Sequence, residues 1–206
     1  MTQSSYITSR ETLRAHFGRP KKIVVDKQLS ALDRHCRTLI ALSPYCILAT
    51  AGANGRCDAS PRGDTPGFVK TPDRYTVLLP DRPGNNRVDS FENIIDNPNV
   101  GLLFLVPGLR ECIRVNGTAK ICISDDRLAE FAVNGRPARA VLEVTVEEAF
   151  IHCGKAAIRS HLWKETYHID PKRLPTIGSM LADQIAGLKA DDADDLLQDS
   201  YTQRLY

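Results

Sequence analysis

Along much of the chain, apolar residues alternate with polar ones in the two-residue period of β-strands. The clearest case is residues 141–147, where Leu142, Val144 and Val146 alternate with Glu143, Thr145 and Glu147. This pattern is typical of a half-exposed antiparallel strand, because successive side chains of a strand point to opposite faces. Asn54-Gly55, between two apolar runs, is a strong hairpin signal. Strands are predicted at residues 45–50, 57–60, 67–70, 74–80, 99–106, 111–124 and 139–151.

The order of these strands predicts the fold class. They follow one another as a meander, without the regular alternation of strand and helix that marks parallel βαβ units. About six antiparallel strands of this length usually close into a small barrel. We therefore predict a mainly β protein, a six-stranded antiparallel barrel with flanking helices.

Helical spacing of apolar residues marks two longer segments outside the strands. Residues 30–42 are predicted to form an amphipathic helix. Ser30 and Asp33 have the form of a capping box, so this helix is expected to begin at Ser30. A second helical stretch covers residues 178–205 and is interrupted near Asp191. It is expected to pack outside the barrel.

Two short helices are predicted between the later strands. Residues 91–97 follow Ser90, which is the expected N-cap, and their apolar side chains, including Ile95, are expected to face inward. Residues 125–134 follow Ser124, with two aspartates near the positive end of the helix dipole. Each short helix would fit at a corner of the barrel.

The chain has 206 residues, which is enough for one compact domain with extensions. We predict a basic N-terminal extension over residues 1–28, a barrel domain over 29–165 and a helical extension over 166–206 that packs on the barrel. The segment after Leu181 is rich in aspartate, whereas residues 1–40 are rich in arginine and lysine. These oppositely charged ends could dock on each other or on a second subunit, or they could be solvated surfaces.

Composition and charge narrow the class of protein. Apolar residues make up 42% and charged residues 25% of the chain, which argues against a disordered, collagen-like or coiled-coil protein. The formal net charge of +2 is too small to indicate nucleic acid as a partner. No stretch has the apolar length of a membrane span, and the first residues lack the pattern of a secretion signal. The sequence thus predicts a soluble, cytoplasmic protein without a membrane partner.

The cysteines and histidines do not form a metal-binding pattern. There is no C-x-x-C pair, and the adjacent His152 and Cys153 would point to opposite faces of a strand. We expect no metal site and interpret the cysteines as reduced, buried thiols of a cytosolic protein. The six are Cys36, Cys46, Cys57, Cys112, Cys122 and Cys153.

One stretch of sequence suggests an anion site. Arg62, Arg82 and Arg87 stand at strand ends or in loops that also contain glycines and two asparagines. Guanidinium groups and free backbone N–H groups suit a phosphate, and a helix beginning at Ser90 would add further donors. The alternative is a polar turn whose arginines are solvated.

Several motifs follow one another in a specific order over about two-thirds of the chain. They are Tyr45-Cys-Ile-Leu-Ala-Thr50, Asp58-Ala-Ser-Pro-Arg-Gly63, Tyr75-Thr-Val-Leu-Leu-Pro-Asp81, Asn85-Asn-Arg87, Phe91-Glu-Asn-Ile94, Arg114-Val-Asn-Gly-Thr-Ala119, His152-Cys-Gly-Lys-Ala-Ala-Ile-Arg-Ser160 and Leu162-Trp163. In this order and spacing the chain resembles the pyridoxamine 5′-phosphate oxidase-like family of FMN-binding split β-barrels, and in particular its shorter members.

The resemblance implies a site for non-covalently bound FMN. In the family, one strand runs along the flavin, and the next lies by the isoalloxazine ring and offers main-chain groups to its polar edge. The matching positions here are Ser60, Pro61 and Arg62, followed by Val77, Leu78, Leu79 and Asp81. Arg87 matches the arginine that contacts the phosphate, helped by Asn86 and Arg62. Gly117 and Thr118 are expected to allow a β-bulge rather than to contact the flavin.

The resemblance also implies a homodimer that binds FMN at the subunit interface, so residues of the other subunit complete each site. Lys155, Arg159 and Trp163 are the candidates. Residues 154–163 could form a short helix with Lys155 and Arg159 on one face. The alternative is a solvated basic helix in which Trp163 is an ordinary packing anchor.

The sequence departs from the oxidase itself at two places. Val88 follows Arg87 where the oxidase has lysine, so one phosphate contact is absent or supplied elsewhere. The C-terminal substrate-binding motif is not recognisable beyond Arg204-Leu205. We therefore expect a flavin-dependent oxidoreductase whose substrate is an unidentified small molecule rather than pyridoxamine phosphate, with NAD(P)H or the substrate as hydride donor. No catalytic residue can be assigned.

Two other functions fit the same features. One is a flavin-binding or redox-sensing module without turnover, because no general acid or base stands near the expected site. The other is a barrel of the same kind that binds haem or another tetrapyrrole, which would need an axial ligand such as His152 or His161.

Overall fold

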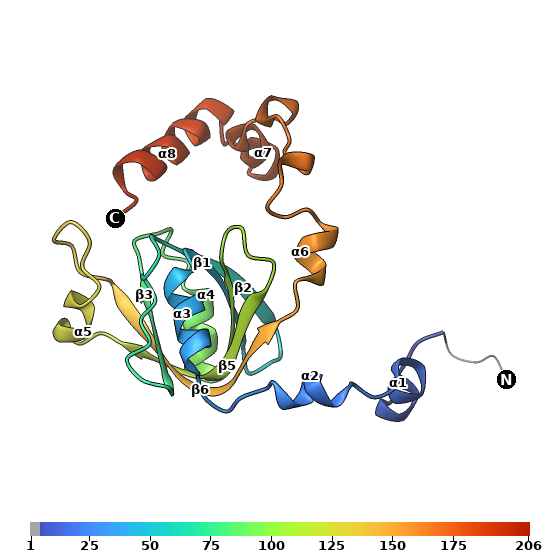
Figure 1. Cartoon of the computed structure of the whole chain (residues 1–206). Helices are drawn as coiled ribbons and strands as arrows, with labels where there is room; N and C mark the ends of the chain where they lie inside the picture. The colour runs from blue at the N-terminus through green and yellow to red at the C-terminus, as the bar shows by residue number, and fades with distance from the viewer. Residues whose placement is uncertain (1–4) are drawn as a thin grey trace.

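The computed structural model describes residues 5–206, and six strands form its core (Figure 1). The strands hydrogen-bond in the order β2-β1-β4-β5-β6-β3, and each neighbouring pair is antiparallel. The sheet curls into a half-barrel, and this confirms the predicted six-stranded antiparallel split β-barrel. The strands are β1 (Tyr45–Ala51), β2 (Cys57–Gly63), β3 (Thr76–Asp81), β4 (Asn99–Leu105), β5 (Cys112–Cys122) and β6 (Ala140–His152).

The inner face of the half-barrel holds the hydrophobic core. In β4 and in most of β5 every second residue is buried, so one face of each strand is inside. Strand β3 is buried on both faces, because Leu78 packs with Phe131 and Val141 in a second, smaller cluster. The main cluster includes Leu32, Ile40, Leu48, Leu102, Phe104, Val115, Leu142 and Val144.

The prediction of a strand at residues 67–70 is wrong. The segment follows a turn in which the Phe68 N–H donates to the Thr65 carbonyl oxygen at 3.1 Å. Gly67 has a φ of 89°, which does not belong to an extended strand. Only Lys70 pairs with the sheet, through a single bridge to Leu78. The buried side chains of this segment therefore come from a loop, not from a strand.

The predicted helix over residues 30–42 is shorter and begins later, as α3 (Arg34–Leu42). Asp33 caps it, since its Oδ1 accepts a 2.7 Å hydrogen bond from the Cys36 N–H. Ser30 lies outside the helix because the preceding residue, Leu29, is bridged to Ala149 of β6. A contact that is distant in the sequence thus holds the chain extended up to the helix start.

Replacing Asp33 with alanine is expected to lower the free energy of unfolding by about 1 kcal/mol, because the N-cap of α3 is lost. The pKa of Asp33 lies below its usual 3.8, chiefly because the Cys36 N–H donates to the charged carboxylate. The ionised Asp33 carboxylate therefore contributes its full stabilisation above pH 3.8. This stabilisation is lost as the pH falls through the lowered pKa. Urea titrations at neutral and acidic pH measure both effects. An Asp33→Asn variant, which keeps the cap without the charge, should lose less stability on acidification than the wild-type protein.

The two short helices also differ from their predicted forms. Helix α4 (Asp89–Asp96) begins before Ser90, which lies inside the helix, is buried and donates to Asp58 Oδ2 at 2.5 Å. Ile95 is 76% exposed, so the prediction that it faces inward is wrong. Helix α5 (Asp125–Ala129) ends well before residue 134, and its expected cap, Ser124, makes no side-chain capping bond.

Helices precede and follow the barrel in the chain (Figure 1). Residues 1–4 of the predicted N-terminal extension lie outside the described residues. None of the helices within residues 5–206 is long and apolar enough to span a membrane. The elements beyond the barrel are α1 (Arg10–Phe17), α2 (Lys22–Asp26), α6 (Lys155–Arg159), two 3₁₀ turns at Glu165–Tyr167 and Pro171–Arg173, α7 (Ile177–Gln184) and α8 (Ala190–Gln203).

The predicted C-terminal helical stretch forms α7 and α8, which lie outside the barrel (Figure 1). The interruption comes before Asp191, at residues 185–189, where Gly187 has a φ of 82°. The two helices pack closely on each other. The Gly178 N–H donates to Asp194 Oδ1 at 2.7 Å, and a Cβ on Gly178 would meet the Ala190 carbonyl oxygen at 2.3 Å.

Candidate functional site

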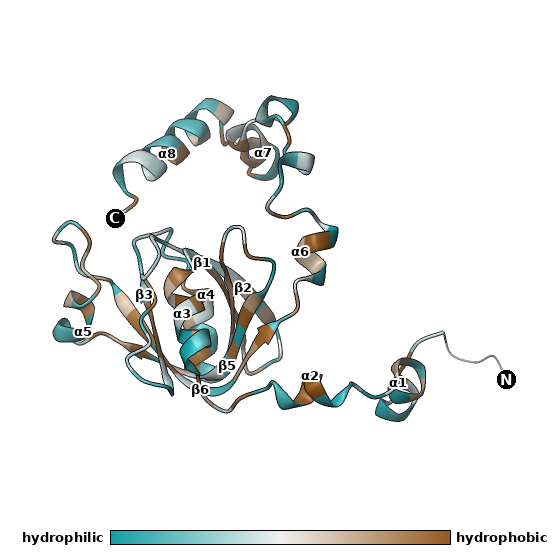
Figure 2. Ribbon diagram, viewed as in Figure 1, coloured by the Kyte–Doolittle hydropathy of each residue, from teal (hydrophilic) through white to brown (hydrophobic). Residues whose placement is uncertain are grey.

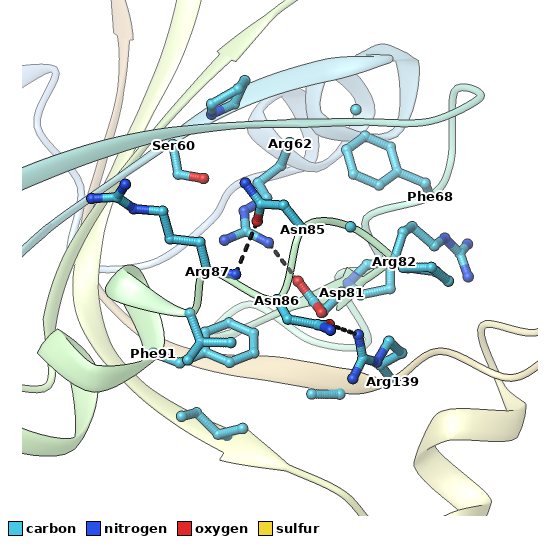
Figure 3. Close-up of a pocket in the computed structure, with 18 of the residues that line it drawn as sticks. Ser60, Arg62, Phe68, Asp81, Arg82, Asn85, Asn86, Arg87, Phe91 and Arg139 are labelled. Atoms are coloured by element: carbon cyan, nitrogen blue, oxygen red, sulfur yellow. Dashed lines mark hydrogen bonds and ion pairs between the residues drawn. The ribbon is translucent and has the colours of Figure 1, made fainter. Parts of the chain in front are cut away.

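A cavity of about 490 Å³ opens where the half-barrel is split (Figure 3). The edge strands β2 and β3 do not pair with each other in the part of the chain that the structure describes. The ends of both strands line the cavity, together with the loop from Arg82 to Val88 and the start of β6. Its volume lies within the range of small-molecule sites.

Two ion pairs span the gap between β2 and β3. Arg62 Nη1 of β2 contacts Asp81 Oδ1 of β3 at 2.6 Å, and both side chains are 20% exposed. Just beyond the strands, Arg82 Nε contacts Asp64 Oδ2 at 2.9 Å. These pairs hold the strand ends together at a place where main-chain hydrogen bonds do not.

Arg62 is held on two sides, by Asp81 and by Phe91. Its guanidinium lies over the ring of Phe91, 5.7 Å from the centroid. Its Nε is buried and has no hydrogen-bond partner within residues 5–206. A buried donor without an acceptor destabilises the fold. Arg62 lines the cavity and its side chain is 20% exposed, so the accessible part of the guanidinium can meet a bound molecule.

The loop after β3 presents polar groups to the cavity. Asn86 has a φ of 59°, and the Arg87 N–H donates to Asn85 Oδ1 at 2.9 Å. The Arg87 side chain is 76% exposed and pairs with Asp89 at 2.7 Å. The hydrogen bond to this carboxylate raises the pKa of Arg87, which therefore stays cationic. An exposed pair of this kind is weak, so Arg87 can turn to another anion.

Arg139 is a cavity residue that sequence reasoning missed. It stands just before β6, and its Nη1 donates to Asn86 Oδ1 (Figure 3). Four arginines line the cavity, and three of them are paired with carboxylates. Arg139 is the one of the four without a carboxylate partner among the described residues. Its charge is available to an anionic ligand.

The structure brings together some of the predicted site residues. Those that line the cavity are Ser60, Pro61, Arg62, Asp81, Asn86 and Arg87. Val77, Leu78 and Leu79 are buried and do not line it. The main-chain N–H and carbonyl of Leu78 are bonded to Lys70. The predicted main-chain contacts of this strand with a ring therefore stay a prediction.

Lys155, Arg159 and Trp163 do not line this cavity. The predicted short helix over residues 154–163 is present as α6, which covers five residues. The indole Nε1 of Trp163 donates to the Leu109 carbonyl oxygen at 2.7 Å, which anchors the segment after α6. A role for these residues at the site of a second subunit stays a prediction.

The apolar lining of the cavity is not predicted from the sequence either. Phe68 comes from the loop at residues 67–70, Ile121 comes from the end of β5, and Ile123 follows just after it. Phe91, predicted only to face inward, covers the guanidinium of Arg62. A pattern of alternation could identify Ile121 as an inward residue, but not which side chains it meets.

The C-terminal residue reaches the wall of this cavity. The Tyr206 hydroxyl donates to Asp64 Oδ1 at 2.8 Å, and its carbonyl oxygen accepts from Arg136 at 2.6 Å. Burial alone would raise the pKa of Asp64, but hydrogen bonds from Thr65, Tyr206 and Arg82 outweigh it and lower the pKa. Asp64 is therefore ionised at neutral pH and fixes Arg82.

The remaining candidate residues are apart from the cavity. Cys36 and Cys46 are buried, and burial raises the pKa of their thiols to about 11 and about 12. Cys57 and Cys153 are exposed, so the prediction of buried thiols is wrong for them. Neither His152 nor His161 lines the cavity, and within residues 5–206 no cluster of three metal-binding side chains occurs.

Comparisons with known proteins give one family match and several similar solved structures. The family model described as pyridoxamine 5′-phosphate oxidase matches residues 32–153. A candidate pyridoxamine 5′-phosphate oxidase from Lactobacillus delbrueckii, of known structure, is 23% identical to the chain, with 60% of this chain and 98% of that one covered and a TM-score of 0.47. HupZ from Group A Streptococcus is 21% identical to the chain, with 58% of this chain and 93% of that one covered and a TM-score of 0.45. An FMN-binding protein from Syntrophomonas wolfei is 14% identical to the chain, with 68% of this chain and 95% of that one covered and a TM-score of 0.45.

A search of curated proteins finds no match to the chain. The family model, however, covers more than half of the chain and includes all six strands of the half-barrel. The protein therefore belongs to the pyridoxamine 5′-phosphate oxidase family.

Proposed function

We propose that the cavity binds FMN non-covalently and that the protein is a flavin-dependent oxidoreductase acting on a small molecule. The observation that carries the proposal is the grouping of four guanidinium groups around one cavity at the split of the half-barrel. Membership of the pyridoxamine 5′-phosphate oxidase family supports the choice of FMN.

The polar loop suits the phosphate of FMN. A phosphate monoester carries nearly two negative charges at neutral pH, so it favours a site with two cations. Arg87 and Arg139 are both exposed, and the amides of Asn85 and Asn86 stand beside them. Arg139 would supply the second positive charge that the sequence lacks after Arg87, where Val88 stands.

The rest of the cavity suits a flat ring system with a polar edge. Phe68, Phe91 and Ile121 provide apolar surface, and Ser60 and Arg62 provide donors. The guanidinium of Arg62 would donate to a carbonyl oxygen of the ring system. Both parts of FMN thus have matching groups in one cavity.

When bound, FMN supplies hydride acceptance from NAD(P)H or a substrate and electron transfer to an acceptor. The residues of the chain bind and orient it. Asp81 fixes the direction of Arg62, and the aromatic side chains exclude water from the ring side of the cavity. The lining carboxylate, Asp81, is paired with Arg62, so we assign no general acid or base.

We further propose that two copies form a homodimer with the cofactor at their interface. Lys155 and Arg159 are exposed on α6 and make no contact with the cavity of their own chain. In a dimer they and Trp163 of the second subunit would complete the site. A homodimer would also cover the open side of the split.

Purified full-length protein tests the proposal. We expect it to be yellow or to take up added FMN with one flavin per chain, as followed by flavin fluorescence, and to oxidise NAD(P)H in the presence of an electron acceptor. Flavin uptake without any turnover would favour a flavin-binding or redox-sensing module. Protein that takes up no flavin but gains a Soret band with haem would overturn the flavin assignment, and so would protein that binds neither.

A further inference from the structure

The N-terminal arm, residues 5–28, is a structured but uncovered surface. Helices α1 and α2 contain no buried residue. Figure 2 shows hydrophobic residues on α2 although the arm leaves the body of the protein. The exposed apolar side chains of the arm include Leu13, Phe17, Ile23, Val24 and Val25.

Helices of this length are not stable by themselves in water. Helix α1 has eight residues and α2 has five, whereas isolated helices shorter than about 12–15 residues are marginal. The capping of α1 by Ser9 is local and does not bury apolar surface. The arm therefore needs a partner surface to keep its helices and to cover its apolar side chains.

The charge of the arm indicates which surface this is. It carries six basic residues against two acidic ones, a net charge of +4. Arg10, Arg19 and Lys21 make no ion pair within residues 5–206. The partner surface should combine exposed apolar side chains with unpaired carboxylates.

Helices α7 and α8, the C-terminal helix pair, have this combination. Helix α8 contains five aspartates and no basic residue. Asp191, Asp192 and Asp195 form no ion pair with any residue of the described chain. Exposed apolar side chains lie among these charges, at Ile177, Ile185, Leu196 and Tyr201.

The arm and the helix pair of one chain are far apart. In Figure 1 they leave the barrel on different sides, so they cannot cover each other within the chain as it is folded. We propose that the N-terminal arm of one copy docks on the C-terminal helix pair of a second copy. The contact joins basic to acidic groups around an apolar centre, which is how stable interfaces are arranged.

A membrane surface is a weaker candidate for the same arm. The apolar and basic character of the arm would suit an anionic lipid surface. The acidic helix pair would be repelled by that surface and would stay uncovered. Docking on a second copy covers both surfaces in one contact and, by symmetry, does so twice in a dimer.

Hydrogen exchange of the full-length protein with charge-reversed variants tests the proposal. The arm variant carries Arg10→Glu and Arg19→Glu, and the helix variant carries Asp192→Lys and Asp195→Lys. At low salt, amides of the arm should exchange about tenfold more slowly in the wild-type protein than in either variant. Amides of β5 and α7 serve as the control that each variant is folded. If the helix variant loses protection in α7, Asp192→Lys alone takes its place.

An equimolar mixture of the two variants decides between docking within and between chains. In a mixed pair, the two new glutamates in the arm of one variant meet the two new lysines in the helix of the other, and the unchanged arm of the second variant meets the unchanged helix of the first. Arm protection should therefore return in the mixture, although each variant alone lacks it. The proposal is overturned if the mixture stays unprotected, if neither reversal changes the exchange of the arm, or if protection of the wild-type arm arises only with phosphatidylserine vesicles.

Discussion

Replacing Gly117 with alanine is expected to destabilise the sheet by roughly 3 kcal/mol or more, because the new methyl group would collide with backbone. A Cβ at this position would lie 1.9 Å from the Thr145 carbonyl oxygen and 2.9 Å from its carbonyl carbon. These atoms belong to β6, which pairs with β5 along its length. Neither strand can move away without breaking its hydrogen bonds, so a urea titration should show a large fall in the midpoint or no folded protein.

Gly84→Ala is the matched control. The nearest atom to a Cβ there is the Arg82 carbonyl oxygen, at 4.0 Å, so the alanine has room. The substitution is expected to change the free energy of unfolding by less than about 0.5 kcal/mol. If Gly117→Ala were as well tolerated as this control, the close approach of β5 and β6 at Gly117 would be wrong.

The same glycine illustrates what the sequence can predict. The predicted bulge is confirmed, because the register of β5 and β6 shifts between Asn116 and Gly117. Local signals of this kind, such as alternation in β5 and the Asn54-Gly55 turn after β1, identify strands and turns well. These signals depend on the residues of the strand or turn itself and not on the residues that pack against it.

The errors arise where a distant contact decides a local choice. Ser30 and Asp33 are both good N-caps, and the sequence does not distinguish them. The bridge between Leu29 and Ala149 selects Asp33 as the N-cap, because it keeps the chain extended beyond Ser30. Ile95 is apolar and was predicted inward, but α4 turns it to solvent.

The site shows the same limit. Arg62, Asn86 and Arg87 could be predicted as lining residues because turn and strand-end signals surround them. Arg139 could not, because it joins the cavity only through the pairing of β3 with β6, in which Asp81 stands opposite Ala140. No pattern in the sequence states that these two strands are neighbours.

Arg139 is also the residue whose replacement should have the largest specific effect on the cofactor. If the proposed FMN site is correct, Arg139→Gln removes a charge-assisted hydrogen bond to the phosphate and should weaken FMN binding about tenfold. Riboflavin, which has no phosphate, should bind to the variant and to the wild-type protein with equal affinity. Titration of flavin fluorescence with both ligands measures the difference. The fold should be unaffected, since Arg139 is exposed and its described partner is the neutral amide of Asn86.

Arg136→Gln provides the control for loss of a positive charge near the cavity. Arg136 is exposed, lies in the same connection between α5 and β6, bonds the carbonyl oxygen of Tyr206 and does not line the cavity. Arg136→Gln should leave FMN affinity nearly unchanged.

Arg87→Gln together with Arg139→Gln should weaken FMN binding roughly a hundredfold, because both positive charges are lost. Equal losses for FMN and riboflavin, or an equal effect of Arg136→Gln, would show that Arg139 does not contact the phosphate and that the phosphate lies elsewhere in the cavity.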